Sequence, residues 1–244
     1  MLFNYKIVFS YDGTNFLGMQ KQAVGRTVQD TMETILSTIA NQKVKLIYAS
    51  RTDKHVHALN QVAAFMTNTK LNLYHFLYAA NLALPDDIYI KTIALVSADF
   101  HPRFQVLKKH YRYLINLREY DPLLRQQMLF LNKALALDKM IEAGKEFIGV
   151  KDFRTFSSVT AEKNSIREIY DIIIGEQNNI ITIDFYGNGF LRYMIRKIVS
   201  ILIDVGLEKK NISDIRNLFA RKDISAYSKI VPGKGLYLVE VYYE

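Results

Sequence analysis

The order of hydrophobic patterns in residues 1–100 constrains the fold of this chain more than any other feature of the sequence. Stretches with strand character occur four times, at residues 5–11, 44–49, 61–67 and 87–96. Two stretches with apolar residues at helical spacing lie between them, and a helix-capping residue, Thr27 or Asn72, precedes each. The predicted order is therefore strand, helix, strand, strand, helix, strand.

The rest of the chain shows a similar order. Strands are predicted at residues 105–117, 166–174, 180–186 and 236–243, and helices at 138–148, 189–205 and, as an insertion, 213–220. Asn178 and Asn179 predict a tight hairpin turn, because Asn tolerates the left-handed backbone that such turns require. The helix at 189–205 is expected to end at Gly206 with a left-handed C-cap.

These patterns predict an α+β protein built from duplicated ferredoxin-like units of order βαββαβ. In such a fold a mostly antiparallel sheet carries its helices packed on one face. The expected boundary lies in the polar stretch 99–104, which gives an N-terminal half of residues 1–103 and a C-terminal half of residues 104–244. A central cleft between the halves is the natural place for a large ligand.

Composition narrows the partners and the chemistry. Lys and Arg number 32 against 24 Asp and Glu, so the chain carries a net charge of +8, which favours a polyanionic partner. The absence of Cys excludes disulfides, thiolate zinc sites and thiol nucleophiles. The first strand includes Lys6 and resembles neither a signal peptide nor a membrane anchor. We expect a cytoplasmic protein with no membrane partner.

Residues 50–65, SRTDKHVHALNQVAAF, contain the strongest candidate for a reactive group. One strand ends before this stretch and another begins within it, so the turn places Asp53 at the rim of a sheet, two residues after Arg51. A carboxylate in such a place can act as a catalytic acid or as a nucleophile. The same Asp could instead cap its own backbone through an Asx turn.

Cations and aromatic rings share the strand at residues 108–113, KKHYRY. Alternation places Lys109 and Tyr111 on one face, and His110 and Arg112 on the other. Such a strand can stack a base while its cations hold phosphates, as proteins that bind unpaired nucleic acid do. A solvated basic face above core tyrosines is the alternative interpretation.

Two further groups of polar residues are candidates for a site. Arg192 and Arg196 are predicted to stand one helical turn apart, with Lys197 adjacent, so that an Arg could reach a carboxylate in the cleft. A solvated helix face is the alternative. His55 and His57 have a spacing that could ligate a metal, but no third ligand stands at a recognisable spacing, and we predict no metal site.

The chain resembles the TruA family of tRNA pseudouridine synthases in motifs that run along nearly its whole length. SRTDKHVHALNQVAAF is similar to the family signature GRTDxGVHA, and YDGTNFLGMQ is similar to YDGxxYxGWQ. The segments FHPRF and HYRY match middle motifs of the family. KDFRTF, GFLRYMIRKIVS and GLYLVEV match motifs of its second half, and all of them occur in family order.

The resemblance implies isomerisation of uridine to pseudouridine in the tRNA anticodon stem-loop, at tRNA positions 38 to 40, by a homodimer that uses no cofactor. It implies that Asp53 is the catalytic aspartate, Tyr111 the tyrosine on the target uracil, and Arg196 the basic partner of the aspartate. Arg51 would help to displace and hold the target nucleotide. The residues assigned to substrate binding are Arg51, Thr52, His57, Lys109, Arg112 and Arg192.

The chain departs from the family pattern close to the aspartate. Ser50, Lys54 and His55 replace small residues or Gly, and Met19 replaces a Trp. Because Arg51, Thr52 and Asp53 are intact, these departures bear on the choice of substrate more than on the reaction. Three alternatives stay open: the same reaction on an rRNA stem-loop, a non-catalytic RNA-binding module, and a metal hydrolase that uses the two histidines.

Overall fold

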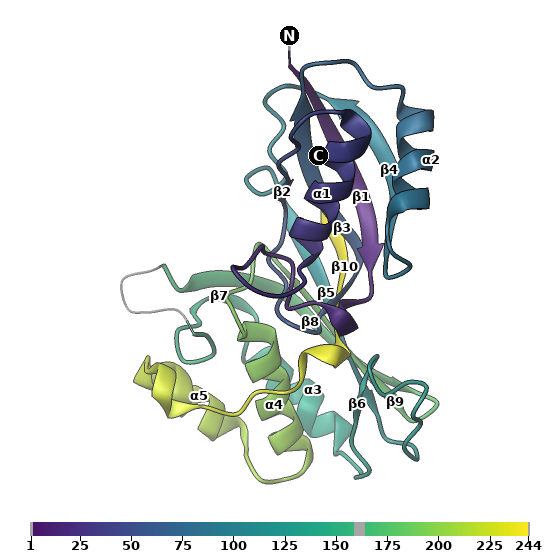
Figure 1. The fold of residues 1–244 in the computed structure, drawn as a ribbon. Coiled ribbons are helices and arrows are strands. Elements are labelled where there is room, and N and C mark those ends of the chain that lie inside the picture. Colours follow the sequence, from purple (N-terminus) through teal and green to yellow (C-terminus); the bar gives the residue numbers. More distant parts are fainter. Residues whose placement is uncertain (1, 159–163, 244) are drawn as a thin grey trace. The chain divides into compact units, whose positions relative to one another are not determined.

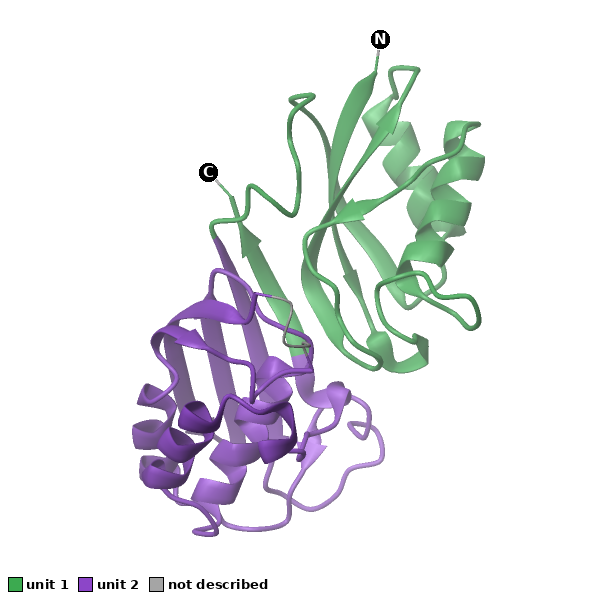
Figure 2. Ribbon diagram, turned by 90° about the vertical axis from the view of Figure 1, so that its left-hand side faces the viewer, with its two compact units in different colours: residues 1–107, 237–244 green, residues 108–236 purple. Residues whose placement is uncertain are grey.

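The computed structural model describes residues 2–158 and 164–243 and shows two compact units (Figure 1, Figure 2). Unit 1 comprises Met1–Leu107 and Tyr237–Glu244, and unit 2 comprises Lys108–Leu236. In the described part of the chain, no helix has both the length and the apolar character needed to cross a bilayer.

Unit 1 is built on an antiparallel sheet of three long strands. β1 (Phe3–Tyr11) lies between β4 (Ile88–Val96) and β3 (His57–Thr67), and it pairs with both. The other side of β3 carries two partners: β2 (Ile47–Tyr48) pairs antiparallel with its second half, and β10 (Leu236–Tyr242) pairs parallel with its first residues. The start of β3 therefore has a strand on each side.

Helices α1 (Val28–Ala40) and α2 (Leu73–Ala83) cover one face of this sheet (Figure 2). Their caps are those that the sequence predicts, since the side chains of Thr27 and Asn72 accept backbone N–H groups of the first helical turn. From Tyr5 to Tyr11, β1 buries every second side chain in the core, whereas Lys6, Val8 and Ser10 between them are partly exposed.

Unit 2 contains an antiparallel sheet in the order β5 (Lys108–Asn116), β9 (Ile180–Gly187), β8 (Ile166–Gln177) and β7 (Gly149–Asp152). A short strand, β6 (Leu129–Phe130), runs parallel to β5. Both residues of the β8–β9 turn have left-handed backbones, with φ of 54° and 58°, which confirms the predicted Asn-Asn hairpin.

Three helices accompany the sheet of unit 2: α3 (Leu137–Lys145), α4 (Met194–Gly206) and α5 (Ile212–Arg221) (Figure 1). Every residue of α4 except Arg196 is buried, so this helix is the centre of the unit's core rather than an amphipathic surface helix.

The described residues also form 3₁₀ turns in both units: η1 (Gly13–Asn15) in unit 1, and η2 (Ile224–Ala226) and η3 (Gly233–Gly235) in unit 2.

The structure confirms the α+β class with mostly antiparallel pairing and corrects several details. The strand expected at residues 44–49 is reduced to Ile47–Tyr48, and β3 begins at His57, four residues earlier than predicted. The expected halves, 1–103 and 104–244, differ from the observed units mainly because β10 pairs with β3 and clusters with unit 1. Such a long-range pairing has no local signal in the sequence.

The predicted start of the long helix is wrong, and so is the conformation predicted for its last residue, although the helix ends at Gly206 as expected. Residues 189–193 are not helical, because Tyr193 has a left-handed backbone with φ of 66°. Gly206 is the last residue of α4 and not a left-handed C-cap. Its lack of a side chain has another cause: a Cβ there would lie 2.7 Å from Sδ of Met140 on α3.

Candidate active site

The turn that contains Asp53 connects β2 to β3 in unit 1, and its backbone is held from both sides. The N–H of Met19 donates to the carbonyl of Thr52 (3.1 Å), and the N–H of Val56 donates to the carbonyl of Asp53 (3.2 Å). The Thr52 hydroxyl lies 2.6 Å from the hydroxyl of Tyr11 at the end of β1. The half-buried Asp53 is thus carried by a turn with little freedom to move.

Two glycines let the loop after β1 approach this turn closely. A Cβ on Gly13 would lie 2.1 Å from the carbonyl oxygen of Val56, and one on Gly18 would lie 2.7 Å from that of Thr52. Gly18 also has φ of +115°, which L side chains rarely adopt. The N-terminal motif YDGTNFLGMQ is therefore the physical support of the Asp53 turn.

Gln61, which the sequence analysis did not single out, fixes the start of the turn. Its side chain is fully buried, and its amide both accepts the N–H of Ser50 (3.2 Å) and donates to the Ser50 carbonyl (2.8 Å). The signal in the sequence was an amide within the apolar strand NQVAAF, because a buried amide requires partners.

His55 occupies a left-handed position in the turn that contains Asp53. Its φ is 63°, a conformation that costs a non-Gly residue about 1–2 kcal/mol. The ring Nδ1 donates to the carbonyl of Thr14 (2.8 Å), and the backbone N–H reaches the carbonyl of Phe16 (3.4 Å). These bonds to the loop after β1 offset part of the backbone cost.

We expect His55→Gly to be more stable than His55→Ala by about 1 kcal/mol. Both variants lose the hydrogen bond to Thr14, but only Ala has a Cβ, which makes the left-handed backbone unfavourable. Urea unfolding of the two variants measures the difference. Equal midpoints would show that the backbone at this position relaxes.

His57 is buried, and the Gly13 N–H donates to its Nδ1 (3.0 Å). Its ring stacks on that of Tyr237 with centroids 4.7 Å apart. His55 precedes the strand, so the two histidines do not project from one strand as the metal hypothesis required. Among the described residues, no group of three His, Cys, Asp or Glu is placed to hold a metal ion.

Arg51 is exposed, two residues before Asp53, and it interacts with a tyrosine that the sequence did not indicate. Burial raises the pKa of Tyr48, and the hydrogen bond and charge of Arg51 offset only part of that rise. The Tyr48 phenol therefore remains a neutral hydrogen-bond partner for the guanidinium at physiological pH.

In unit 2, β5 presents buried groups on both faces rather than one solvated basic face. Tyr111 is 5% exposed and contacts the Phe190 ring edge-on, with centroids 5.3 Å apart. On the other face, Nε2 of His110 lies 2.5 Å from a carboxylate oxygen of Asp184, and the Arg112 Nε donates to the same oxygen (2.8 Å). The long-range partner Asp184 explains the burial of His110.

Burial raises the pKa of Asp184, but the hydrogen bonds from His110 and Arg112 outweigh it and hold the pKa below its usual value. A carboxyl group whose pKa is lowered by folding stabilises the folded state at pH values above its unfolded-state pKa, which is near 4. This stabilisation is lost as the pH falls through the folded-state pKa.

We therefore expect Asp184→Asn to lower the free energy of unfolding by about 1–2 kcal/mol at pH 7, a modest value because the Arg112 side chain is 40% exposed. The difference from wild type should shrink as the pH falls below 4. Urea unfolding at pH 7 and pH 3 measures it, and a difference that is the same at both pH values would contradict the assignment.

The two arginines of the long helix are placed differently from the prediction. Because α4 begins at Met194, Arg192 precedes the helix, and only Arg196 lies within it. The Arg196 Nε donates to the carbonyl of Val231 (2.8 Å). Lys197 is buried, and its Nζ donates to the carbonyls of Thr155 (3.1 Å) and Ser157 (3.0 Å), so the solvated-face interpretation is wrong for this residue.

Comparisons with known proteins agree with the motifs. A family model described as tRNA pseudouridine synthase matches residues 7–105 and 143–244. The tRNA pseudouridine synthase A of Acetivibrio thermocellus is 41% identical over 242 residues, covering 98% of this chain and 99% of that protein. The proteins of the same name from Thermoanaerobacter sp. (strain X514) and Geotalea uraniireducens are each 38% identical, over 98% of this chain and 99% and 98% of theirs.

This chain belongs to the tRNA pseudouridine synthase family. The Asp53 turn lies in the first segment that the family model matches, and Arg196 lies in the second, whereas Tyr111 lies between them. Within unit 1 the structure brings together Arg51, Thr52, Asp53 and His57. Lys109, Tyr111, Arg112, Arg192 and Arg196 belong to unit 2, and the predicted cleft stays a prediction.

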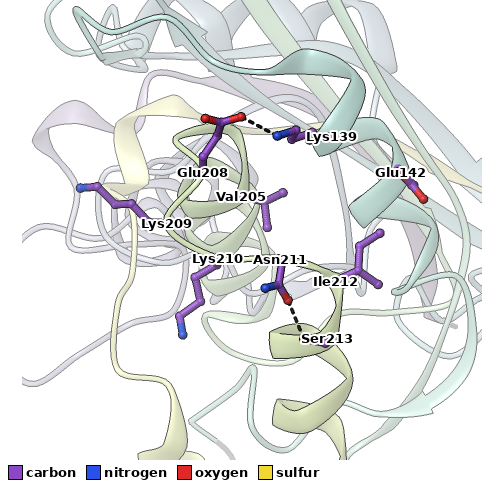
Figure 3. Close-up of a pocket in the computed structure, with 9 residues that line it drawn as sticks. All are labelled: Lys139, Glu142, Val205, Glu208, Lys209, Lys210, Asn211, Ile212 and Ser213. Carbon is purple, nitrogen blue, oxygen red and sulfur yellow. Dashed lines mark hydrogen bonds and ion pairs between the residues drawn. The ribbon is translucent and has the colours of Figure 1, made fainter.

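A separate pocket of this synthase-family protein, of about 600 Å³, is lined by residues of α3, the end of α4 and the start of α5 (Figure 3). None of the residues predicted for the site line it. Its Lys139 pairs with Glu208, and its Lys210 pairs with Asp214, so much of the positive charge around it is balanced. Nothing in its chemistry resembles the Asp53 turn.

Proposed function

We propose that this protein converts uridine to pseudouridine in the anticodon stem-loop of tRNA, at positions 38 to 40. The observation that carries the proposal is the intact Arg51-Thr52-Asp53 turn, which its own unit holds rigidly, in a member of the tRNA pseudouridine synthase family. The relatives' names supply the substrate class.

The reaction is an isomerisation and balances without any added reagent. The bond from C1′ to N1 breaks, the uracil turns, C1′ bonds to C5, and the proton of C5 leaves as N1 gains one. Asp53 can act as a nucleophile on the nucleotide, or it can remove the 2′ proton to form a glycal. Because no electrons are exchanged with an outside partner, the chemistry needs no redox cofactor.

Asp53 has to be ionised for either route, and a nearby cation favours that state. We propose that Arg196 supplies this charge when RNA is bound. Tyr111, whose ring is nearly buried against Phe190, is proposed to pack on the detached uracil. A rigid aromatic platform limits the orientations open to the detached base.

Substrate binding is proposed to rest on exposed and half-exposed cations. Arg51 and Arg192 are exposed, and Lys109 and Arg112 are partly exposed, so their charges can reach phosphates. Removing a base from its stack costs about a few kcal/mol, which such contacts offset. Thr52 and His57 are buried, and we propose that they serve the substrate by holding the turn in place.

We further propose that the protein works as a homodimer in the cytoplasm. The family resemblance supports the dimer, and the absence of Cys agrees with a reducing compartment. Sedimentation equilibrium of the purified protein tests the dimer.

The experiment that tests the function is tritium release from tRNA transcripts labelled at uridine C5. Wild-type protein should release tritium from a transcript with uridine at positions 38 to 40, and not from one with cytidine at those positions. A labelled rRNA stem-loop is the comparison, because Lys54 and His55 depart from the family pattern. Tritium release from the rRNA stem-loop alone would show that the protein catalyses the same reaction on a different substrate. No release from any of these RNAs would overturn the proposal.

A further inference from the structure

Seven described residues other than Gly have a left-handed backbone, and five of them have an ordinary local reason. Asn41 and Lys222 are the C-caps of α1 and α5, Asn178 and Asn179 form the hairpin, and Glu208 follows the end of α4. The two that remain are His55 and Tyr193. His55 lies two residues after Asp53, and Tyr193 lies three residues before Arg196. Unusual backbone conformations of this kind gather at functional sites.

Tyr193 is the more unusual of the two, because bulky residues rarely adopt this conformation. It occupies the N-cap position of α4 with φ of 66° and ψ of −2°, yet its side chain makes no capping hydrogen bond. Asn, Asp, Ser and Thr serve that position better. Stability of the helix therefore does not explain a tyrosine here.

The tyrosine ring instead contacts two guanidinium groups. The Cζ of Arg192 lies 4.7 Å from the ring centroid, and the Cζ of Arg196 lies 5.3 Å from it. The Arg192 Nη2 also donates to the Tyr193 hydroxyl (2.8 Å). The left-handed turn at Tyr193 brings the residue before it and the residue three positions after it to the same ring.

The Arg196 guanidinium has a second support in the same unit. Its Nε donates to the Val231 carbonyl (2.8 Å), and the backbone N–H of Val231 is directed back at the Arg196 carbonyl (3.4 Å). The hydrogen bond from Nε fixes the inner end of the planar guanidinium group. Contact with an aromatic ring restricts the rest of the group.

We infer that Tyr193 is a positioning residue whose ring orients the Arg196 guanidinium for pseudouridine formation, an inference that rests on the proposed function of Arg196. The same ring and hydroxyl would orient Arg192. Tyr193 would then position both Arg196, which is proposed to act on Asp53, and Arg192, which is proposed to bind the RNA. The chemistry requires such support, because a cation that stabilises a reacting carboxylate acts only when its position is fixed beforehand.

The test uses Tyr193→Asn, which keeps a residue suited to the left-handed backbone but removes the ring, and Tyr193→Phe, which keeps the ring. Lys222→Asn is the matched control, because it places the same residue at another left-handed position of unit 2. The first readout needs no RNA: hydrogen exchange at the Arg196 Nε–H, followed by NMR and assigned with an Arg196→Lys variant. Exchange should be about tenfold faster in Tyr193→Asn and unchanged in Tyr193→Phe and Lys222→Asn.

The second readout is turnover on the tRNA transcript. Tyr193→Asn should lower kcat about tenfold or more, with KM within about threefold and a melting temperature no lower than that of wild type, whereas Tyr193→Phe should keep kcat within about threefold of wild type. Unchanged exchange at Arg196 in Tyr193→Asn would overturn the inference, whether or not the protein is active. A fall in kcat that Tyr193→Phe shares would overturn it too, because the ring would then not be the cause. If wild type releases no tritium, the proposed function fails, and the exchange measurement alone decides whether Tyr193 orients Arg196.

Discussion

Asp53→Ala is expected to reduce tritium release from uridine-C5-labelled RNA by at least about 10³-fold, because no other group can replace a missing nucleophile or base. RNA affinity should stay within about threefold, since the cations proposed to hold the phosphates are unchanged. The fold should also persist, because backbone hydrogen bonds and the Thr52 side chain hold the turn. Initial rates of tritium release and filter binding of the same RNA measure the two effects.

Asp86→Ala is the matched control for this variant, since Asp86 is an exposed carboxylate of the same unit, outside the turn. It should leave turnover and affinity unchanged. Turnover of Asp53→Ala at the wild-type rate would contradict the assignment of Asp53. A parallel loss of RNA binding would instead show that the carboxylate, or the shape of the turn, contributes to binding.

Gly18→Ala is expected to lower the free energy of unfolding by about 2–4 kcal/mol and to reduce turnover with it. Two causes act together at this position: the φ of +115° is strained for any L side chain, and the new Cβ would lie 2.7 Å from the Thr52 carbonyl oxygen, a backbone atom that cannot rotate away. The Asp53 turn or the loop after β1 has to move. Urea unfolding and tritium release report the two consequences.

Gly175→Ala provides the control for that variant. Gly175 lies in β8 without a left-handed backbone, and the nearest atom to an added Cβ is the Thr182 hydroxyl oxygen at 3.8 Å. The urea midpoint of Gly175→Ala should therefore stay close to that of wild type. Equal midpoints for Gly18→Ala and wild type would mean that the loop after β1 does not support the turn as the distances indicate.

Local chemistry explains why much of the fold could be predicted from the sequence. Thr27 and Asn72 cap α1 and α2 through contacts within one helical turn, and the Asn-Asn pair forms its hairpin through its own backbone preference. The Arg51-Thr52-Asp53 triplet was found as a motif at a strand end, where the structure places it. These features depend on residues that are neighbours along the chain.

Other features could not be predicted, because their causes lie far away along the chain. His110 was placed on a basic face, but Asp184, 74 residues later, accounts for its burial. The start of the long helix was predicted too early because apolar spacing carries no information about a left-handed tyrosine. The support of Ser50 by Gln61 was also missed, since an amide within an apolar strand indicates that it needs partners but not which residues they are.

The sequence by itself determined the order of the longer strands and helices, the hairpin, the family and the candidate carboxylate Asp53, since periodicity, capping and motif spacing all act over short distances, whereas the short strands β6 and β7 were not predicted. Only the tertiary structure decided what holds Asp53 in place, why Gly13 and Gly18 are required, and how one tyrosine contacts two arginines. Those arrangements depend on close packing and on the burial of polar groups, which exist only when distant segments have met.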